Sequence, residues 1–243
     1  MSVKYKSDEE FTDIEIKDLL STFFVTLLVT RACNAKCTYC DVIYESTGKP
    51  MKSRIVNQDE FDKVLEFIDF QDSPFRPNLN LSFFGGEPTI NPNLNHFIEK
   101  SHIHFKGKRN LDLQMTSNLI KPIEYFVDLG HVRTAASLHT EQIKESSTEW
   151  FKKVNLLHER NMLQHVVMML TKSNIDEIIQ LYKEYADQFK CIVVPIDQFM
   201  SSDEYETMKR FVCDELGTNP FEHDEEKFPF FDQENELNKE LGH

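Results

Sequence analysis

Short apolar runs alternate with segments of helical periodicity along most of this chain, and this alternation constrains the fold more than any other feature. Buried parallel strands read as continuous apolar runs, and amphipathic helices connect them. The pattern is therefore typical of repeated strand–helix units. We predict six strands, at residues 23–30, 79–84, 111–117, 132–139, 163–170 and 191–197.

The segments between the predicted strands have the spacing of helices. Pro92 and Pro122 stand where a first helical turn tolerates a missing N–H group. Right-handed connections between six successive units curl a parallel sheet into an incomplete barrel. We therefore expect an α/β fold, a partial (β/α)6 TIM-like barrel that is open on one side. The predicted helices cover residues 58–70, 92–105, 122–129, 145–160 and 174–189.

The 243 residues are enough for one substantial domain. We divide the chain into an N-terminal extension (1–22), the barrel (23–197) and a C-terminal extension (198–243). The C-terminal extension combines an amphipathic segment, 203–216, with an acidic tail rich in aromatic residues. We expect this tail to be a partly ordered flap at the open side of the barrel, rather than a fixed wall.

The charge of the chain argues against two classes of partner. It has 41 acidic and 27 basic residues and a net charge of -14, which repels nucleic acid and anionic membranes. The first twenty residues lack the apolar stretch of a secretory signal, and no run approaches a membrane span. We therefore expect a soluble, cytoplasmic protein that binds neither nucleic acid nor a membrane.

Three of the five cysteines are clustered, at Cys33, Cys37 and Cys40, directly after the first predicted strand. In barrels of this kind the chemistry takes place where the strands end. Three thiolates in one short loop suit an iron–sulfur cluster with one open iron position. A zinc site completed by a distant histidine, or three unligated core cysteines, are the alternatives, and the spacing favours the cluster.

The run VTRACNAKCTYC resembles the signature of the radical S-adenosylmethionine (SAM) superfamily, including the aromatic Tyr39 before the last cysteine. The resemblance implies that Cys33, Cys37 and Cys40 hold a 4Fe-4S cluster and that SAM chelates its open iron. It also implies an electron donor such as flavodoxin or ferredoxin. Reductive cleavage of SAM would then give methionine and a 5'-deoxyadenosyl radical.

The second predicted strand ends in FFGGEPTI, which is similar to the GGEP motif of the same superfamily. Gly85 and Gly86 would allow close backbone approach to a ligand. Glu87 would accept hydrogen bonds from the ammonium group of SAM, and Pro88 completes the motif. An ordinary turn is the alternative for these four residues.

Small polar residues at other strand ends resemble family positions that contact SAM. Ser117, Asn118 and Ser137 are expected to contact its methionyl or ribose part, although such residues are more often satisfied loop residues. Asn174 has a familiar position in the run VVMMLTKSNIDEIIQLYKEY, but a helix cap would explain it equally.

Other residues are candidates for contact with a substrate. His139, at a predicted strand end, could orient a substrate or move a proton. Cys213 could donate a hydrogen atom, as a thiol does in some family epimerases, although a structural cysteine is the simpler interpretation. Lys172, Asp197 and Gln198 also follow predicted strands.

The resemblance predicts an enzyme whose radical abstracts hydrogen from an unidentified substrate, either a peptide or protein or a small metabolite. A non-catalytic zinc- or cluster-binding interaction protein is the alternative from another class. Beyond the motif only Cys191 and Cys213 remain, so we expect no auxiliary-cluster extension of the SPASM type.

Overall fold

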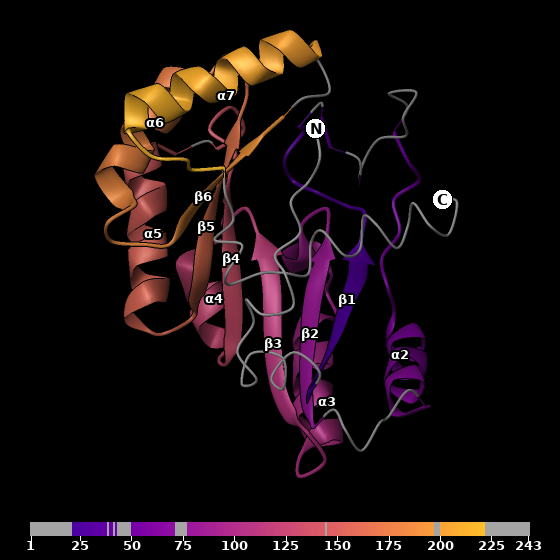
Figure 1. Cartoon of the computed structure of the whole chain (residues 1–243). Coiled ribbons are helices and arrows are strands. Elements are labelled where there is room, and N and C mark those ends of the chain that lie inside the picture. Colours follow the sequence, from indigo (N-terminus) through magenta and orange to yellow (C-terminus); the bar gives the residue numbers. More distant parts are fainter. Residues whose placement is uncertain are drawn as a thin grey trace, which may run out of the picture.

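Six parallel strands form one sheet in the order β1-β2-β3-β4-β5-β6, so each strand pairs with its neighbours along the chain (Figure 1). The structure is a computed structural model that describes residues 21–37, 39–40, 42, 50–70, 77–143, 145–196 and 200–221. The predicted α/β partial barrel is confirmed. The strands are β1 (Thr22–Thr30), β2 (Asn78–Gly85), β3 (Asn110–Ser117), β4 (Val132–Leu138), β5 (Leu163–Leu170) and β6 (Cys191–Pro195).

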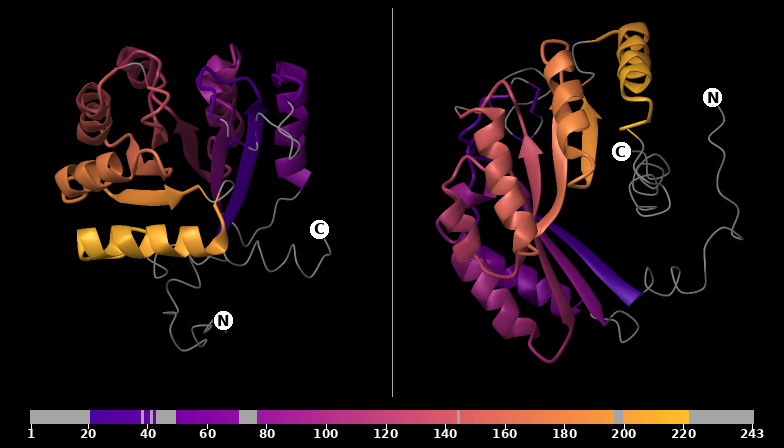
Figure 2. Two further views of the ribbon diagram at one scale, coloured as in Figure 1. Left: turned by 90° about the horizontal axis from the view of Figure 1, so that it is seen from above. Right: turned by 90° about the vertical axis from the view of Figure 1, so that its left-hand side faces the viewer.

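The helices that connect one strand to the next lie along the convex side of the curved sheet (Figure 2). Because a parallel strand must return to the same end of the sheet, each connection carries a helix across that face. A short 3-10 helix, η2 (Pro88–Ile90), follows β2 directly. The α-helices are α2 (Gln58–Phe70), α3 (Leu94–Phe105), α4 (Ile123–Asp128), α5 (Ser147–Glu159), α6 (Ile175–Tyr185) and α7 (Ser202–Leu216).

The hydrophobic core lies between the sheet and these helices. Alternate residues of β2 point into it, because side chains of a strand alternate between its two faces, and Leu81 and Phe83 are fully buried. The rings of Phe61 on α2 and Phe97 on α3 stack with centroids 4.3 Å apart against this face. Trp150 on α5 is also fully buried.

Most differences from the predicted boundaries occur at helix ends. Pro92 and Pro122 both lie before the first helical residue, since Asn93 and Pro122 occupy the N-cap positions of α3 and α4. The amphipathic segment 203–216 is helix α7, which starts with a capping box between Ser201 and Glu204. None of the helices within the described ranges is long and apolar enough to cross a membrane. The predicted tail flap lies outside the described residues, which end at 221.

The sheet has two edges, because within the described residues β1 and β6 pair with one neighbouring strand each. Thr30 at the end of β1 forms an antiparallel bridge with Ile55. At the other edge, the backbone N–H of Val193 donates to Pro220 O, 3.1 Å away, beyond the end of α7. The sheet is thus an open barrel, as the six-unit pattern predicts.

The loop that carries the cysteines is docked onto the diglycine at the end of β2. Gly86 N donates to Thr30 O at 2.8 Å, and Glu87 N donates to Ala32 O at 2.9 Å. A Cβ atom on Gly85 would lie 2.1 Å from Thr30 O, and one on Gly86 would lie 2.3 Å from Ala32 O. The glycines therefore allow close approach of another backbone segment, where the sequence had suggested a ligand.

Replacing Gly86 with Ala should destabilise the cluster-free protein by about 2 to 3 kcal/mol, because the added Cβ collides with a carbonyl that the loop needs. Urea unfolding measures this change. The matched control is Gly107→Ala, at a glycine with φ +73 and no atom within 4 Å of the added Cβ. That control should cost about 1 kcal/mol from backbone strain alone. A loss for Gly86→Ala no larger than the control would contradict the docking argument.

Candidate functional site

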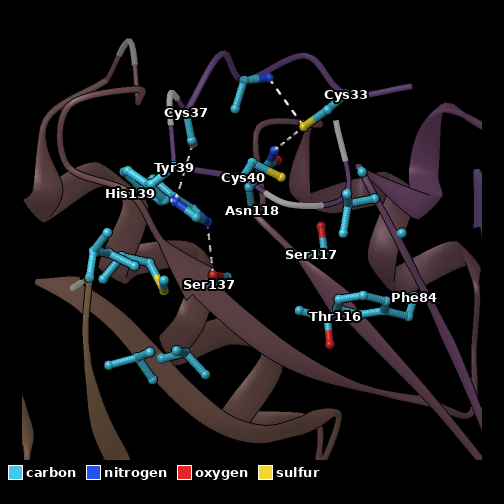
Figure 3. A pocket seen from close by; sticks show the side chains of 18 of the residues that line it. Cys33, Cys37, Tyr39, Cys40, Phe84, Thr116, Ser117, Asn118, Ser137 and His139 are labelled. Carbon is cyan, nitrogen blue, oxygen red and sulfur yellow. Dashed lines mark hydrogen bonds between the residues drawn. The ribbon is translucent and has the colours of Figure 1, made fainter. Parts of the chain in front are cut away.

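A cavity of about 440 Å³ opens at the carboxyl ends of the strands, beneath the cysteine loop (Figure 3). This is the size of a pocket for a small organic ligand or cofactor. Its wall near the loop is polar and includes the cysteines, Ser117 and Asn118. The opposite wall is apolar and comes from β5, β6 and the residue after β6, through Val167, Met169 and Ile196.

The three clustered cysteines all line this cavity as free thiols. Burial raises the pKa of Cys33 to about 11 and also raises the pKa of Cys37. A metal group must therefore displace protons from these sulfur atoms when it binds. Among the described residues, no three His, Cys, Asp or Glu side chains surround one point as the ligands of a single ion do. Ligands of a four-iron cluster bind different irons, so three thiols on one cavity wall fit that group.

The carboxylate of Glu87 does not line the cavity, although the sequence led us to expect it beside SAM. Its side chain is buried at 1% exposure and caps η2. It accepts hydrogen bonds from Thr89 N (3.2 Å), Thr89 Oγ1 (2.7 Å), Ser117 Oγ (2.9 Å) and Asn118 N (2.9 Å). Burial raises the pKa of Glu87, and these donors oppose the rise. The structure thus gives Glu87 a positioning role, joining the end of β2 to the end of β3. A direct contact with SAM stays a prediction. Pro88 is likewise buried, inside η2.

Asn118 connects the end of β3 to the cysteine loop. Its Nδ2 donates to Asn34 Oδ1 at 2.8 Å and lies 3.9 Å from Cys33 Sγ. Its backbone oxygen accepts a bond of 2.9 Å from the indole N–H of Trp150. Both Asn34 and Trp150 thus support the site, although no motif pointed to them.

His139 lies at the centre of a chain of polar contacts on the other side of the cavity (Figure 3). Its Nδ1 lies 2.9 Å from Tyr39 Oη and 3.4 Å from Cys37 Sγ, and its Nε2 lies 2.9 Å from Ser137 Oγ. Burial lowers the pKa of His139 to about 4, so the ring is neutral near pH 7. The structure thus brings the predicted residues Tyr39, Ser137 and His139 together.

Asn174 is buried outside the cavity and closes the turn before α6. Its Oδ1 accepts from Thr171 N at 2.7 Å, and its Nδ2 donates to Met169 O and Thr140 Oγ1. Although it occupies the N-cap position, its side chain makes no cap hydrogen bond. The loop itself uses the amide, so the expected side-chain cap is not formed, and a contact of Asn174 with the cofactor stays a prediction.

Cys213 and Lys172 also lie away from the cavity. The thiol of Cys213, on α7, contacts Asn219 Oδ1 at 3.6 Å, which fits a structural cysteine, and its role as a hydrogen donor stays a prediction. Lys172 forms an ion pair with Glu204 on α7. The other two substrate candidates, Asp197 and Gln198, fall outside the described residues.

The apolar wall is the part of the site that sequence reasoning missed. Val167 and Met169 occupy positions near the carboxyl end of β5 and line the cavity, as Phe84 of β2 and Thr116 of β3 do outside this wall. The available signal was their alternation with buried core residues along each strand, combined with the rule that barrel sites lie at this end.

Replacing Glu87 with Gln should lower the free energy of unfolding of the cluster-free protein by about 1 to 3 kcal/mol. The reason is that an amide N–H₂ would face donors in place of one carboxylate oxygen. Thermal or urea unfolding measures this, with Glu124→Gln, at an exposed residue of α4, as the control. Unchanged stability together with weakened SAM binding would contradict the positioning role and favour a direct contact with SAM.

Comparison with solved structures gives the same fold. The chain superposes on native anSMEcpe with bound AdoMet (SAM) with a TM-score of 0.62 and 14% identity, over 79% of this chain and 60% of that one. The complex of anSMEcpe with AdoMet and the Kp18Cys peptide gives a TM-score of 0.61 at 14% identity, over 79% and 59%. The chain thus spans about 60% of the length of these neighbours. At this identity the likeness shows the fold alone.

Comparison with curated protein sequences finds no match. The family model described as the radical SAM superfamily matches residues 27–185, which is more than half of the chain and runs from the last part of β1 to the end of α6, with the cysteine and diglycine motifs. The chain therefore belongs to the radical SAM superfamily, an enzyme family that implies a 4Fe-4S cluster and SAM as cofactors.

Proposed function

We propose that this chain generates a 5'-deoxyadenosyl radical from SAM and uses it to abstract hydrogen from a peptide or protein substrate. One observation carries the proposal: three free thiols, the diglycine and an apolar wall all line the same cavity. When bound, the cluster and SAM supply one-electron reductive cleavage of SAM to methionine and the radical. The electron comes from a donor such as flavodoxin or ferredoxin.

The residues of the cavity suit these two cofactors. Cys33, Cys37 and Cys40 would hold the cluster. Ser117 and Ser137 line the cavity with small side chains that leave room for SAM, while the Ser117 hydroxyl donates to Glu87 and the Ser137 hydroxyl faces His139 Nε2. The apolar wall at β5 and β6 offers a surface for its adenine ring and keeps water away from the reacting centre.

The concave face of the barrel continues away from this cavity and supports a larger substrate. The six strands contain two charged side chains of the types Asp, Glu, Lys and Arg. These are Asp112 and Arg133, and they form an ion pair on this face. The carboxylate also accepts from Asn80 Nδ2 at 2.9 Å and from Gln114 Nε2 at 2.6 Å. The charges of the pair cancel, so the surface is neutral and rich in hydrogen-bonding groups. Such a surface complements a peptide chain better than a charged polymer.

The distance from this polar surface to the cavity also fits an extended substrate. Gln114 and Asp112 precede the cavity residue Thr116 by two and four positions on β3. At about 3.3 Å per residue they lie about 7 and 13 Å from it, which an extended peptide spans in a few residues. The open side of the sheet offers lateral entry, and the neighbour anSMEcpe is known with a bound peptide.

The substrate class can be tested with deuterium transfer. Cells of the source organism are grown in deuterated medium, and their extract is separated into a peptide and protein fraction and a small-molecule fraction. Each fraction is incubated anaerobically with reconstituted enzyme, unlabelled SAM and dithionite. Since the radical takes one hydrogen atom from its substrate, we expect mass spectrometry to find deuterium in 5'-deoxyadenosine with the peptide and protein fraction.

The controls separate the proposed activity, formation of the radical, from the proposed substrate class, a peptide or protein. Cys37→Ala should abolish formation of 5'-deoxyadenosine, while Cys213→Ala should leave it unchanged. Deuterium transfer from the small-molecule fraction alone would overturn the peptide assignment in favour of a metabolite. If the cluster-loaded protein forms no 5'-deoxyadenosine with either fraction, the proposed activity itself is wrong.

A further inference from the structure

His139 joins the β4 side of the cavity to the cysteine loop through both of its ring nitrogens. Nδ1 faces the Tyr39 hydroxyl and the Cys37 sulfur, while Nε2 faces the Ser137 hydroxyl (Figure 3). The Tyr39 ring stacks on the imidazole at an interplanar angle of 14°, with centroids 6.1 Å apart. The orientation of the imidazole is therefore determined by three side chains.

The backbone beside His139 holds the same loop independently. The carbonyl of His139 accepts from Gln142 N at 2.8 Å and from Ile143 N at 3.1 Å, which forms a tight turn after β4. From that turn, Gln142 Oε1 accepts a hydrogen bond of 3.0 Å from Lys36 N, directly before Cys37. Because the turn positions the loop without the ring, replacing the imidazole alone need not release the loop.

The direction of the hydrogen bonds depends on the state of the Cys37 sulfur. A neutral imidazole has one N–H group, whereas the hydroxyls of Tyr39 and Ser137 can each donate or accept. A Cys37 thiol can donate to Nδ1, with Nε2–H then donating to Ser137 Oγ. A thiolate that binds iron has no proton and can only accept. The favourable arrangement is then Ser137 O–H donating to Nε2, with Nδ1–H shared between the Cys37 sulfur at 3.4 Å and the Tyr39 oxygen at 2.9 Å.

We propose that His139 is a positioning residue that donates Nδ1–H to the Cys37 thiolate of the cluster-loaded protein and thereby raises the reduction potential of the cluster. This inference rests on the proposed ligation by Cys37. Reduction adds negative charge to the cluster, and a donor to a ligand sulfur stabilises the more negative state. Hydrogen bonding to sulfur is a recognised control of cluster potential, and no charged side chain is needed for it.

The test is the midpoint potential of the anaerobically reconstituted cluster, followed by electron paramagnetic resonance without SAM. In His139→Leu, which has no donor, we expect the equilibrium constant for reduction to fall about tenfold, or about 59 mV for one electron. His139→Asn should retain most of the wild-type potential, because an Asn amide nitrogen occupies roughly the place of Nδ1. Ser137→Ala should shift the potential in the same direction as His139→Leu. The substitution removes the hydroxyl that donates to Nε2 and thereby favours the tautomer with its proton on Nδ1.

The control is His158→Gln, at an exposed histidine near the end of α5, which should leave the potential unchanged. Iron and sulfide analysis shows whether each variant holds its cluster. Unchanged potentials in His139→Leu and Ser137→Ala would overturn the proposal, as would equal shifts in His139→Leu and His139→Asn. If His139→Leu holds no cluster, an unchanged potential in Ser137→Ala overturns the proposal by itself. A wild-type protein that binds no cluster would instead contradict the proposed function.

Discussion

The site depends on the direct backbone contact between the cysteine loop and the diglycine that ends β2. Two short N–H···O bonds, from Gly86 to Thr30 and from Glu87 to Ala32, leave no room for a Cβ atom at either glycine. The contact joins the end of β1 to the end of β2, where the buried Glu87 carboxylate then reaches β3. The ends of three strands and the thiols are thus connected before any cofactor binds.

The fold could be predicted because each strand and helix leaves its pattern in a short, continuous stretch of sequence. Six apolar runs with helical segments between them correspond to β1 to β6, and right-handed connections leave few other arrangements. The first residues of the helices were harder to predict, because the sequence does not say on which side of a helix boundary a proline falls. Pro92 and Pro122 are compatible with the last residues of a loop as well as with a first turn.

The motifs located the candidate site, but they did not tell which group each side chain meets. Glu87 is predicted from its motif to meet a ligand, and the motif gave no sign that its carboxylate also accepts from four donors of its own chain. The amide of Asn174 is used in the same way by its loop. Such contacts depend on tertiary distances, which one sequence does not contain. The association of Tyr39 with His139, one hundred positions apart, is equally invisible in the sequence.

The central claim is that Cys33, Cys37 and Cys40 present one cluster with an open iron to the cavity beneath them. Mössbauer spectroscopy of the anaerobically reconstituted protein, with and without SAM, tests it most directly. The account predicts a 4Fe-4S spectrum in which one iron site changes when SAM is added. Stoichiometric zinc without iron, or a cluster in which no iron responds to SAM, would contradict it.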